Sequence, residues 1–148
     1  MRRVFCFPLL VLLAASTLTP AVALARNTEV FISAPEVINS DHGKSFLLDI
    51  PIYMKGARHP AVAKELEQVT TNQSTRGAFR SDDASCRVAF LSAAKVLQQR
   101  AQQAGGDAVV DVVSITRRTQ TEDTTNFRCV AGAMVVHVGL KGRVVKLK

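Results

Sequence analysis

The 148-residue chain has no tryptophan, one tyrosine and three cysteines, and it lacks the short motifs that mark common enzyme classes. It contains no G-x-S-x-G, no H-E-x-x-H, and no S-x-x-K followed by its usual partner motifs. A G-x-x-x-x-G-K-[ST] motif is also missing, which excludes a P-loop site for a nucleoside triphosphate. The sequence therefore predicts a protein that is not an enzyme, although an active site assembled only in the fold would leave no such motif.

Metal-ligand spacings are missing as well. There is no C-x-x-C or H-x-x-x-H, and His42, His59 and His137 are scattered along the chain. We take His59 and His137 as candidate ligand-binding residues, although a solvated loop histidine and a core-edge histidine are the simpler interpretations. Asp107 and Asp111 are expected to cap a turn and to pair with an arginine or lysine, respectively. We predict no metal and no cofactor, and we keep metal or small-ligand binding as the alternative function.

The first 25 residues have the three-part form of a secretory signal peptide. Two arginines precede an apolar run over residues 4–15, and small residues precede Arg26. The run is shorter than the roughly 20 residues that a spanning helix needs. Cys6 lies before the run, not at the cleavage point where a lipoprotein carries its cysteine. We therefore expect cleavage near Ala25 and a mature protein in the periplasm or secreted.

The chain without this leader is moderately basic. The whole chain has 19 Lys plus Arg and 12 Asp plus Glu, and the leader carries two arginines and no acid, so 17 minus 12 leaves +5. Such an excess favours polyanions. Export separates the protein from nucleic acid, so we expect no nucleic-acid partner and at most a peripheral attraction to the anionic envelope surface. No repeat or linker divides residues 26–148, which we take as a single domain.

Two cysteines, Cys86 and Cys129, remain after such cleavage. An even count in an oxidising compartment favours one intramolecular disulfide. The alternatives are a metal site and a reactive thiol at Cys86, which a helix N-terminus and Arg87 would activate. We predict the Cys86–Cys129 disulfide.

The segment 82–104 has the signals of a long helix. Ser81 is a suitable N-cap, two aspartates follow it at the positive end of the helix dipole, and Gly105-Gly106 supplies a stop. Apolar residues recur at helical spacing, namely Phe90, Leu91, Ala94, Leu97, Ala101 and Ala104. Cys86 lies four residues before Phe90, so we expect it on the buried side.

Valine-rich segments after the helix predict neighbouring antiparallel strands. We expect strands over 107–115 and 127–138, a hairpin loop over 117–126, a turn near 139–142, and a last strand over 143–147. In the second strand, the face toward the helix is predicted to carry Cys129, Ala131, Ala133, Val135 and His137. The opposite face is apolar, and either N-terminal segments or another subunit should cover it.

The N-terminal half is expected to add strands over 28–34 and 45–54, the second at a sheet edge because of Pro51. The spacing of Val62, Leu66 and Val69 predicts a short helix over 61–70, and the polar segment 71–79 a loop. The predicted fold class is α+β, with one long helix packed on a mainly antiparallel sheet.

Two stretches carry a family resemblance, CRVAFLSAAKVLQQRAQQAGGDAVVDVVS and FRCVAGAMVVHVGLKGRVVKL. With the upstream KGARHPAVAKELEQV, they resemble small exported bacterial proteins labelled excinuclease ATPase subunit-like, over most of the mature chain. More distantly, the helix followed by Gly-Gly-Asp-Ala-Val-Val is similar to the YbjQ-like family and to the periplasmic domain of the Rcs envelope-stress lipoprotein.

These resemblances imply a compact α+β domain with a helix on a sheet, and in the YbjQ-like group a ring oligomer. They transfer no catalytic residue, and without an ATP-binding motif they imply neither ATPase nor nuclease activity. We therefore expect a non-enzymatic, envelope-associated protein, stabilised by one disulfide, that binds another protein or self-associates.

Overall fold

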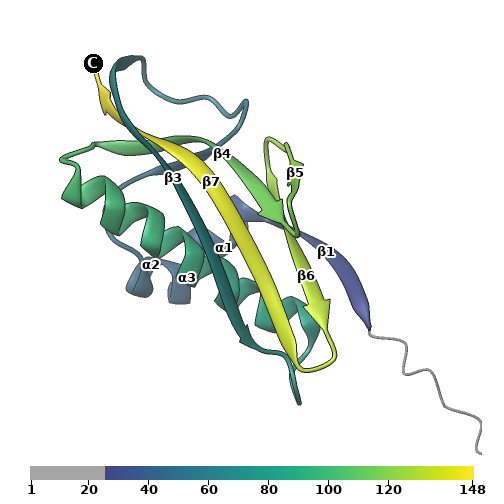
Figure 1. Cartoon of the computed structure of the whole chain (residues 1–148). Helices are drawn as coiled ribbons and strands as arrows, with labels where there is room; N and C mark the ends of the chain where they lie inside the picture. Colours follow the sequence, from purple (N-terminus) through teal and green to yellow (C-terminus); the bar gives the residue numbers. More distant parts are fainter. Residues whose placement is uncertain (1–25) are drawn as a thin grey trace, which may run out of the picture.

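The computed structural model describes residues 26–148; the predicted signal peptide and its cleavage point lie outside the described residues. In chain order the elements are β1 (Asn27–Ser33), α1 (Ala34–Asn39), α2 (Asp41–Phe46), β2 (Ile52–Met54), β3 (Val62–Arg76), α3 (Asp82–Gln103), β4 (Ala108–Thr116), β5 (Thr119–Thr121), β6 (Asn126–Gly132) and β7 (Val135–Leu147). Figure 1 shows α3 lying along one face of a curled sheet. The predicted α+β class is confirmed.

Helix α3 forms as its local signals predict. The Ser81 hydroxyl accepts the N–H of Ala84 at 3.2 Å, and Asp82 and Asp83 occupy the first turn. After Gln103 the chain leaves the helix through Gly105, whose φ of 68° suits glycine. The fully buried apolar residues of α3 are Cys86, Ala89, Phe90, Ala93, Ala94, Leu97 and Ala101. No helix among residues 26–148 is long and apolar enough to cross a membrane.

Strand β7 is the centre of the sheet. One of its edges pairs with β3 along nearly its whole length, and its other edge pairs with β4 and then with β6. Strand β1 continues the sheet beyond β6, and β2 continues it beyond β4. All strand pairs are antiparallel except β2 with β4.

The turn predicted near 139–142 is wrong, because both of its glycines lie inside β7. A Cβ at Gly139 would lie 1.8 Å from the carbonyl oxygen of Ile115, and one at Gly142 would lie 2.8 Å from a methyl group of Val109. These glycines therefore permit close approach of β4 to β7 and do not reverse the chain.

The single strand predicted over 127–138 is also wrong. The chain turns at Ala133 and Met134, between β6 and β7. Cys129 and Ala131 face α3 as expected, but beyond the turn the parity changes. The side chains buried in the core are then those of Val136 and Val138, not those of Val135 and His137.

The helix predicted over 61–70 and most of the loop predicted over 71–79 are wrong. Strand β3 spans both, and its register with β7 runs from Val62 opposite Leu147 to Arg76 opposite Val135. Burial of Val69 and Thr71, with Thr70 exposed between them, shows the alternation of a strand. The helical spacing of the apolar residues was coincidental, because the pairing with β7 decides the conformation.

The strand predicted over 45–54 is confirmed only at its end. Residues 41–46 form α2, whose N-cap Ser40 accepts the N–H of Gly43 at 3.0 Å. Residues 47–51 have no regular structure, and β2 follows Pro51 at the edge of the sheet, as the proline predicts.

The sheet face away from α3 was expected to need a cover. A small cluster of Ala108, Val110 and Val145 lies there. Tyr53 and Val62 from the N-terminal half pack against it. The expected apolar face of the segment 127–138 is not formed as predicted, because Val136 and Val138 lie in the main core.

Candidate functional site

The two predicted half-cystines are joined. Cys86 near the start of α3 and Cys129 in β6 form a disulfide with their Cα atoms 5.8 Å apart. Both residues are fully buried. The predicted pairing is confirmed, and in this oxidised form neither sulfur is a thiol that could react or bind a metal.

The structure does not bring the two candidate histidines together. His59 lies in the β2–β3 loop, with its ring centroid 5.6 Å from that of Tyr53 and its Nδ1 2.7 Å from the carbonyl oxygen of Pro60. His137 lies in β7 opposite Ser74. The loop of His59 leads into Val62, which lies opposite Leu147 at the end of β7. His137 is ten residues earlier in β7, so roughly 30 Å of strand separates the two histidines. Among residues 26–148 no three His, Cys, Asp or Glu side chains are grouped as a metal site.

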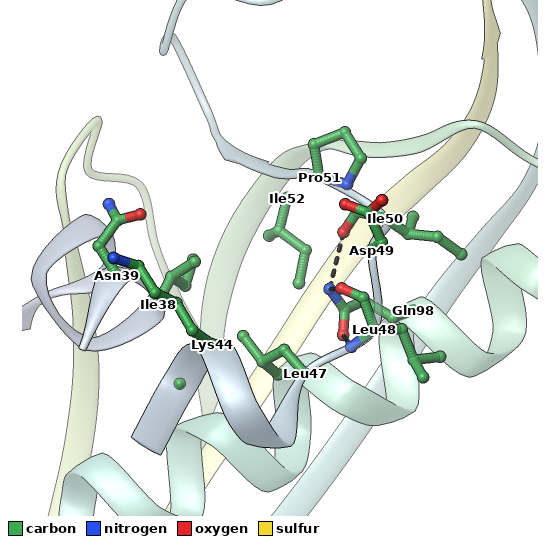
Figure 2. A pocket seen from close by; sticks show the side chains of 11 residues that line it. Ile38, Asn39, Lys44, Leu47, Leu48, Asp49, Ile50, Pro51, Ile52 and Gln98 are labelled. Atoms are coloured by element: carbon green, nitrogen blue, oxygen red, sulfur yellow. Dashed lines mark hydrogen bonds between the residues drawn. The ribbon is translucent and has the colours of Figure 1, made fainter. Parts of the chain in front are cut away.

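A groove of about 540 Å³ lies between the short helices α1 and α2 and the segment that leads into β2 (Figure 2). Its lining combines aliphatic and polar residues and consists of Ile38, Asn39, Gly43, Lys44, Leu47, Leu48, Asp49, Ile50, Pro51, Ile52 and Gln98. The charged residues Lys44 and Asp49 are exposed. None of the lining residues is a serine, threonine, cysteine or histidine, so the groove offers apolar contacts and no nucleophile of those types.

Gln98 of α3 holds one wall of this groove. Its side chain is only 3% exposed. The Oε1 atom accepts the N–H of Leu48 at 2.8 Å, and Nε2 donates to the carbonyl oxygens of Leu48 and Ile50 at 2.8 and 2.7 Å. These bonds hold residues 48–50 against α3, although the segment belongs to no strand.

Sequence reasoning missed Gln98. The available signal was its position, seven residues after Leu91 and four after Ala94, which places a polar side chain on the apolar stripe of α3. A glutamine at such a position must find buried partners, and an irregular backbone segment is a suitable one.

The groove follows an unpaired backbone edge. Strand β2 lies at the edge of the sheet, next to β4. Two backbone hydrogen bonds show which N–H and C=O groups of this segment face β4. The N–H of Val109 donates to the carbonyl oxygen of Pro51 at 3.0 Å, and the N–H of Lys55 donates to that of Val112 at 2.9 Å. Backbone groups alternate between the two sides of a strand, so the N–H and C=O of Ile52 face away from β4.

A smaller hollow of about 170 Å³ extends the groove along this edge, since the two share Ile38, Asn39 and Ile52. Met54, Ala57 and Thr124 are among its further lining residues. The result is a mostly apolar channel beside Ile52, whose N–H and C=O face away from the sheet, which is the arrangement that accepts an added strand.

A second, polar hollow of about 430 Å³ lies where β4 and β7 meet, and its lining includes Asp111 and Arg143. Arg143 bonds to Asp111 and, at 2.6 Å, to Glu65, and these hydrogen bonds raise the pKa of its guanidinium above the ordinary value. Asp111 has a φ of 52° at a bulge in β4. The predicted pairing of Asp111 with an arginine is confirmed, and these charges mainly satisfy one another.

Comparisons of the chain with family models, curated proteins and solved structures found no match.

Proposed function

We propose that this protein is an exported, non-enzymatic domain of the cell envelope that binds an extended segment of another protein in the groove beside β2. The observation that carries the proposal is the free edge of Ile52 above an aliphatic lining. A strand added at such an edge gains main-chain hydrogen bonds, while alternate side chains enter the groove and give specificity.

The lining suits such a segment. Ile38 on one side and Ile52 on the other offer apolar contacts to side chains that point inward (Figure 2). Lys44 and Asp49 carry opposite charges, which would favour one direction of a charged segment over the other. Gln98 keeps the wall ordered before binding, so less conformational entropy is lost on association.

Two observations support the exported location. A buried disulfide accords with an oxidising compartment, and the first 25 residues have the pattern of a secretory leader. The resemblance to small exported proteins and to the envelope-stress lipoprotein domain points the same way.

The experiment is a selection of binders from a displayed random-peptide library against the protein isolated from the envelope fraction. We expect peptides with apolar residues at alternate positions, bound with the backbone extended. Replacing Ile52 by alanine removes the side chain only, whereas Ile52→Pro also removes the outward N–H at a position where an edge strand tolerates proline. We expect Ile52→Ala to weaken binding and Ile52→Pro to abolish it with the fold intact.

Methylation of alternate backbone nitrogens in the selected peptide should abolish binding for the same reason. Equal binding of the methylated and unmethylated peptides, or of the Ile52→Ala and Ile52→Pro variants, would refute strand addition. Sedimentation without peptide tests a different occupant. Association that rises with concentration and is lost in Ile52→Pro would make a second copy of the chain the occupant, in place of another protein.

A further inference from the structure

The loop after β3 and the loop before β7 lie side by side at one end of the molecule (Figure 1). Phe79, between β3 and α3, is fully exposed, and Met134 and Val135, at the β6–β7 turn, are 69% and 38% exposed. The N–H of Gly77 donates to the carbonyl oxygen of Met134 at 2.9 Å, which holds the loops together. We name Phe79, Met134 and Val135 the apolar tip.

The backbone of Phe79 is unusual. Its φ is 65°, in the left-handed region that glycine and asparagine adopt readily and bulky residues avoid. The ring has no core contact that would offset this strain, because it projects into solvent. The backbone conformation of Phe79 and the exposure of its ring are both unfavourable for folding. Such a residue indicates that the side chain serves a contact with another molecule.

Cationic side chains flank the tip. Arg76 lies opposite Val135 in the strand register, and Arg80 follows Phe79. Neither forms an ion pair or a side-chain hydrogen bond with another residue of the described range 26–148, whereas Arg87, Arg128 and Arg143 are all ion-paired. Free guanidinium groups beside exposed apolar groups match an anionic lipid surface, which offers phosphate groups above an apolar layer.

We infer that the apolar tip, with Arg76 and Arg80, docks on an anionic membrane surface, with the ring of Phe79 entering the boundary between head groups and acyl chains. A protein partner is the poorer match. Three side chains on projecting loops contribute little toward the roughly 1,000 Å² that a stable protein interface buries.

This docking leaves the groove accessible. Ile52 pairs with Val109, which pairs with Val144 near the far end of β7, whereas the tip adjoins Val135 at its start. About nine residues of strand, roughly 30 Å, separate the two sites. The inference does not rest on the proposed groove binding, and each can fail alone.

The test uses the absence of tryptophan in the chain. Phe79→Trp introduces a single fluorescent reporter at the tip, and Phe31→Trp places one on β1, where Phe31 is 52% exposed outside the tip. With vesicles containing phosphatidylglycerol we expect a blue shift for Phe79→Trp and none for Phe31→Trp. Vesicles of phosphatidylcholine alone should give little shift, and added salt should weaken the response.

Charge is tested in the same assay with Arg76→Gln/Arg80→Gln, for which we expect roughly a tenfold or greater loss of vesicle affinity. The matched control is Arg58→Gln, because Arg58 lies in the exposed β2–β3 loop at the other end of β3. Phe79→Asn should lose affinity without lowering the melting temperature, since asparagine tolerates the left-handed backbone.

Three outcomes would overturn the inference. The first is an emission of Phe79→Trp that is the same with vesicles and in buffer. The second is an equal loss of affinity in Arg58→Gln and in the double arginine variant, which would show a general effect of charge. The third is a blue shift that rises with protein concentration without lipid, which would make the tip a contact between copies of the chain.

Discussion

The rings of Phe90 in α3 and Phe127 in β6 stack with their centroids 4.0 Å apart and their planes 13° apart. Cys86 lies one helical turn before Phe90, and Cys129 lies two residues beyond Phe127 on the same strand face. The disulfide and the ring pair therefore join the same two elements side by side. All four residues are fully buried. A covalent bond and an apolar contact therefore hold α3 on the sheet at the same place.

Removal of the disulfide should lower stability without changing the fold. The two cysteines are separated by 43 positions, so they close a loop of 43 plus 1, or 44, residues, for which the chain-entropy model gives about 4 kcal/mol. Cys86→Ala/Cys129→Ala should lose about that free energy of unfolding in denaturant titrations. A reductant should destabilise the wild type and leave the double variant unchanged. Identical titrations of the wild type with and without reductant would contradict the prediction.

Truncation of the ring pair should be similarly costly. Phe90→Ala leaves a cavity beneath α3, and we expect a loss of about 3–5 kcal/mol in the free energy of unfolding. Phe31→Ala is the control, since the exposed Phe31 should cost less than about 1 kcal/mol. Thermal and denaturant unfolding of both variants checks this, and a Phe90→Ala loss as small as that of Phe31→Ala would show that the stack adds little.

Sequence reasoning predicted α3 well because its determinants are local. Ser81, the two acidic residues after it and Gly105 lie within or beside the helix, and they act whatever packs against them. The conformation of strand β3, in contrast, is determined by residues far away in the sequence. The spacing of Val62, Leu66 and Val69 fits a helix, but a strand forms because the edge of β7, about seventy residues later, supplies its hydrogen bonds.

The candidate site was less predictable than the fold. Residues 47–51 adopt no regular structure, and their position depends on hydrogen bonds to Gln98, about fifty residues away. The disulfide was predictable because it follows from the even count of cysteines after the predicted leader and from the predicted export. The apolar tip was not, since its loops meet only after β3 and β7 have paired.

Loss of the Gln98 side chain should release the wall of the groove. Gln98→Leu leaves the N–H of Leu48 and the carbonyl of Ile50 without their partner, and we expect a loss of about 2 kcal/mol in the free energy of unfolding. Hydrogen exchange should become faster in residues 47–51. The neighbouring Gln99→Leu is the matched control, because Gln99 is exposed and should change stability by less than about 0.5 kcal/mol. Unchanged exchange in Gln98→Leu would show that other contacts hold the segment.

Stability should also fall in acid, and the β5–β6 connection shows why. Backbone hydrogen bonds from the N–H groups of Asn126 and Thr125, each 2.8 Å long, hold the pKa of Asp123 below its ordinary 3.8. A hydrogen bond from Lys55 lowers the pKa of Glu122 below its ordinary 4.5. Both carboxylates are thus favoured in the charged form by the folded state.

The pKa of Asp107 is lowered in the same direction, first by the hydrogen bond from Lys146 and then by the N–H of Leu147. A carboxyl group whose pKa is lower in the folded state stabilises the fold above its unfolded pKa and loses that contribution as the pH falls through its folded value. We therefore expect a level free energy of unfolding down to about pH 5 and a decline below about pH 4.5. Asp123→Asn keeps an acceptor but no charge, so its acid decline should be shallower. Denaturant titrations between about pH 2 and 7 give the free energy of unfolding of both proteins. If this free energy falls equally in both as the pH is lowered, Asp123 contributes nothing to the acid decline.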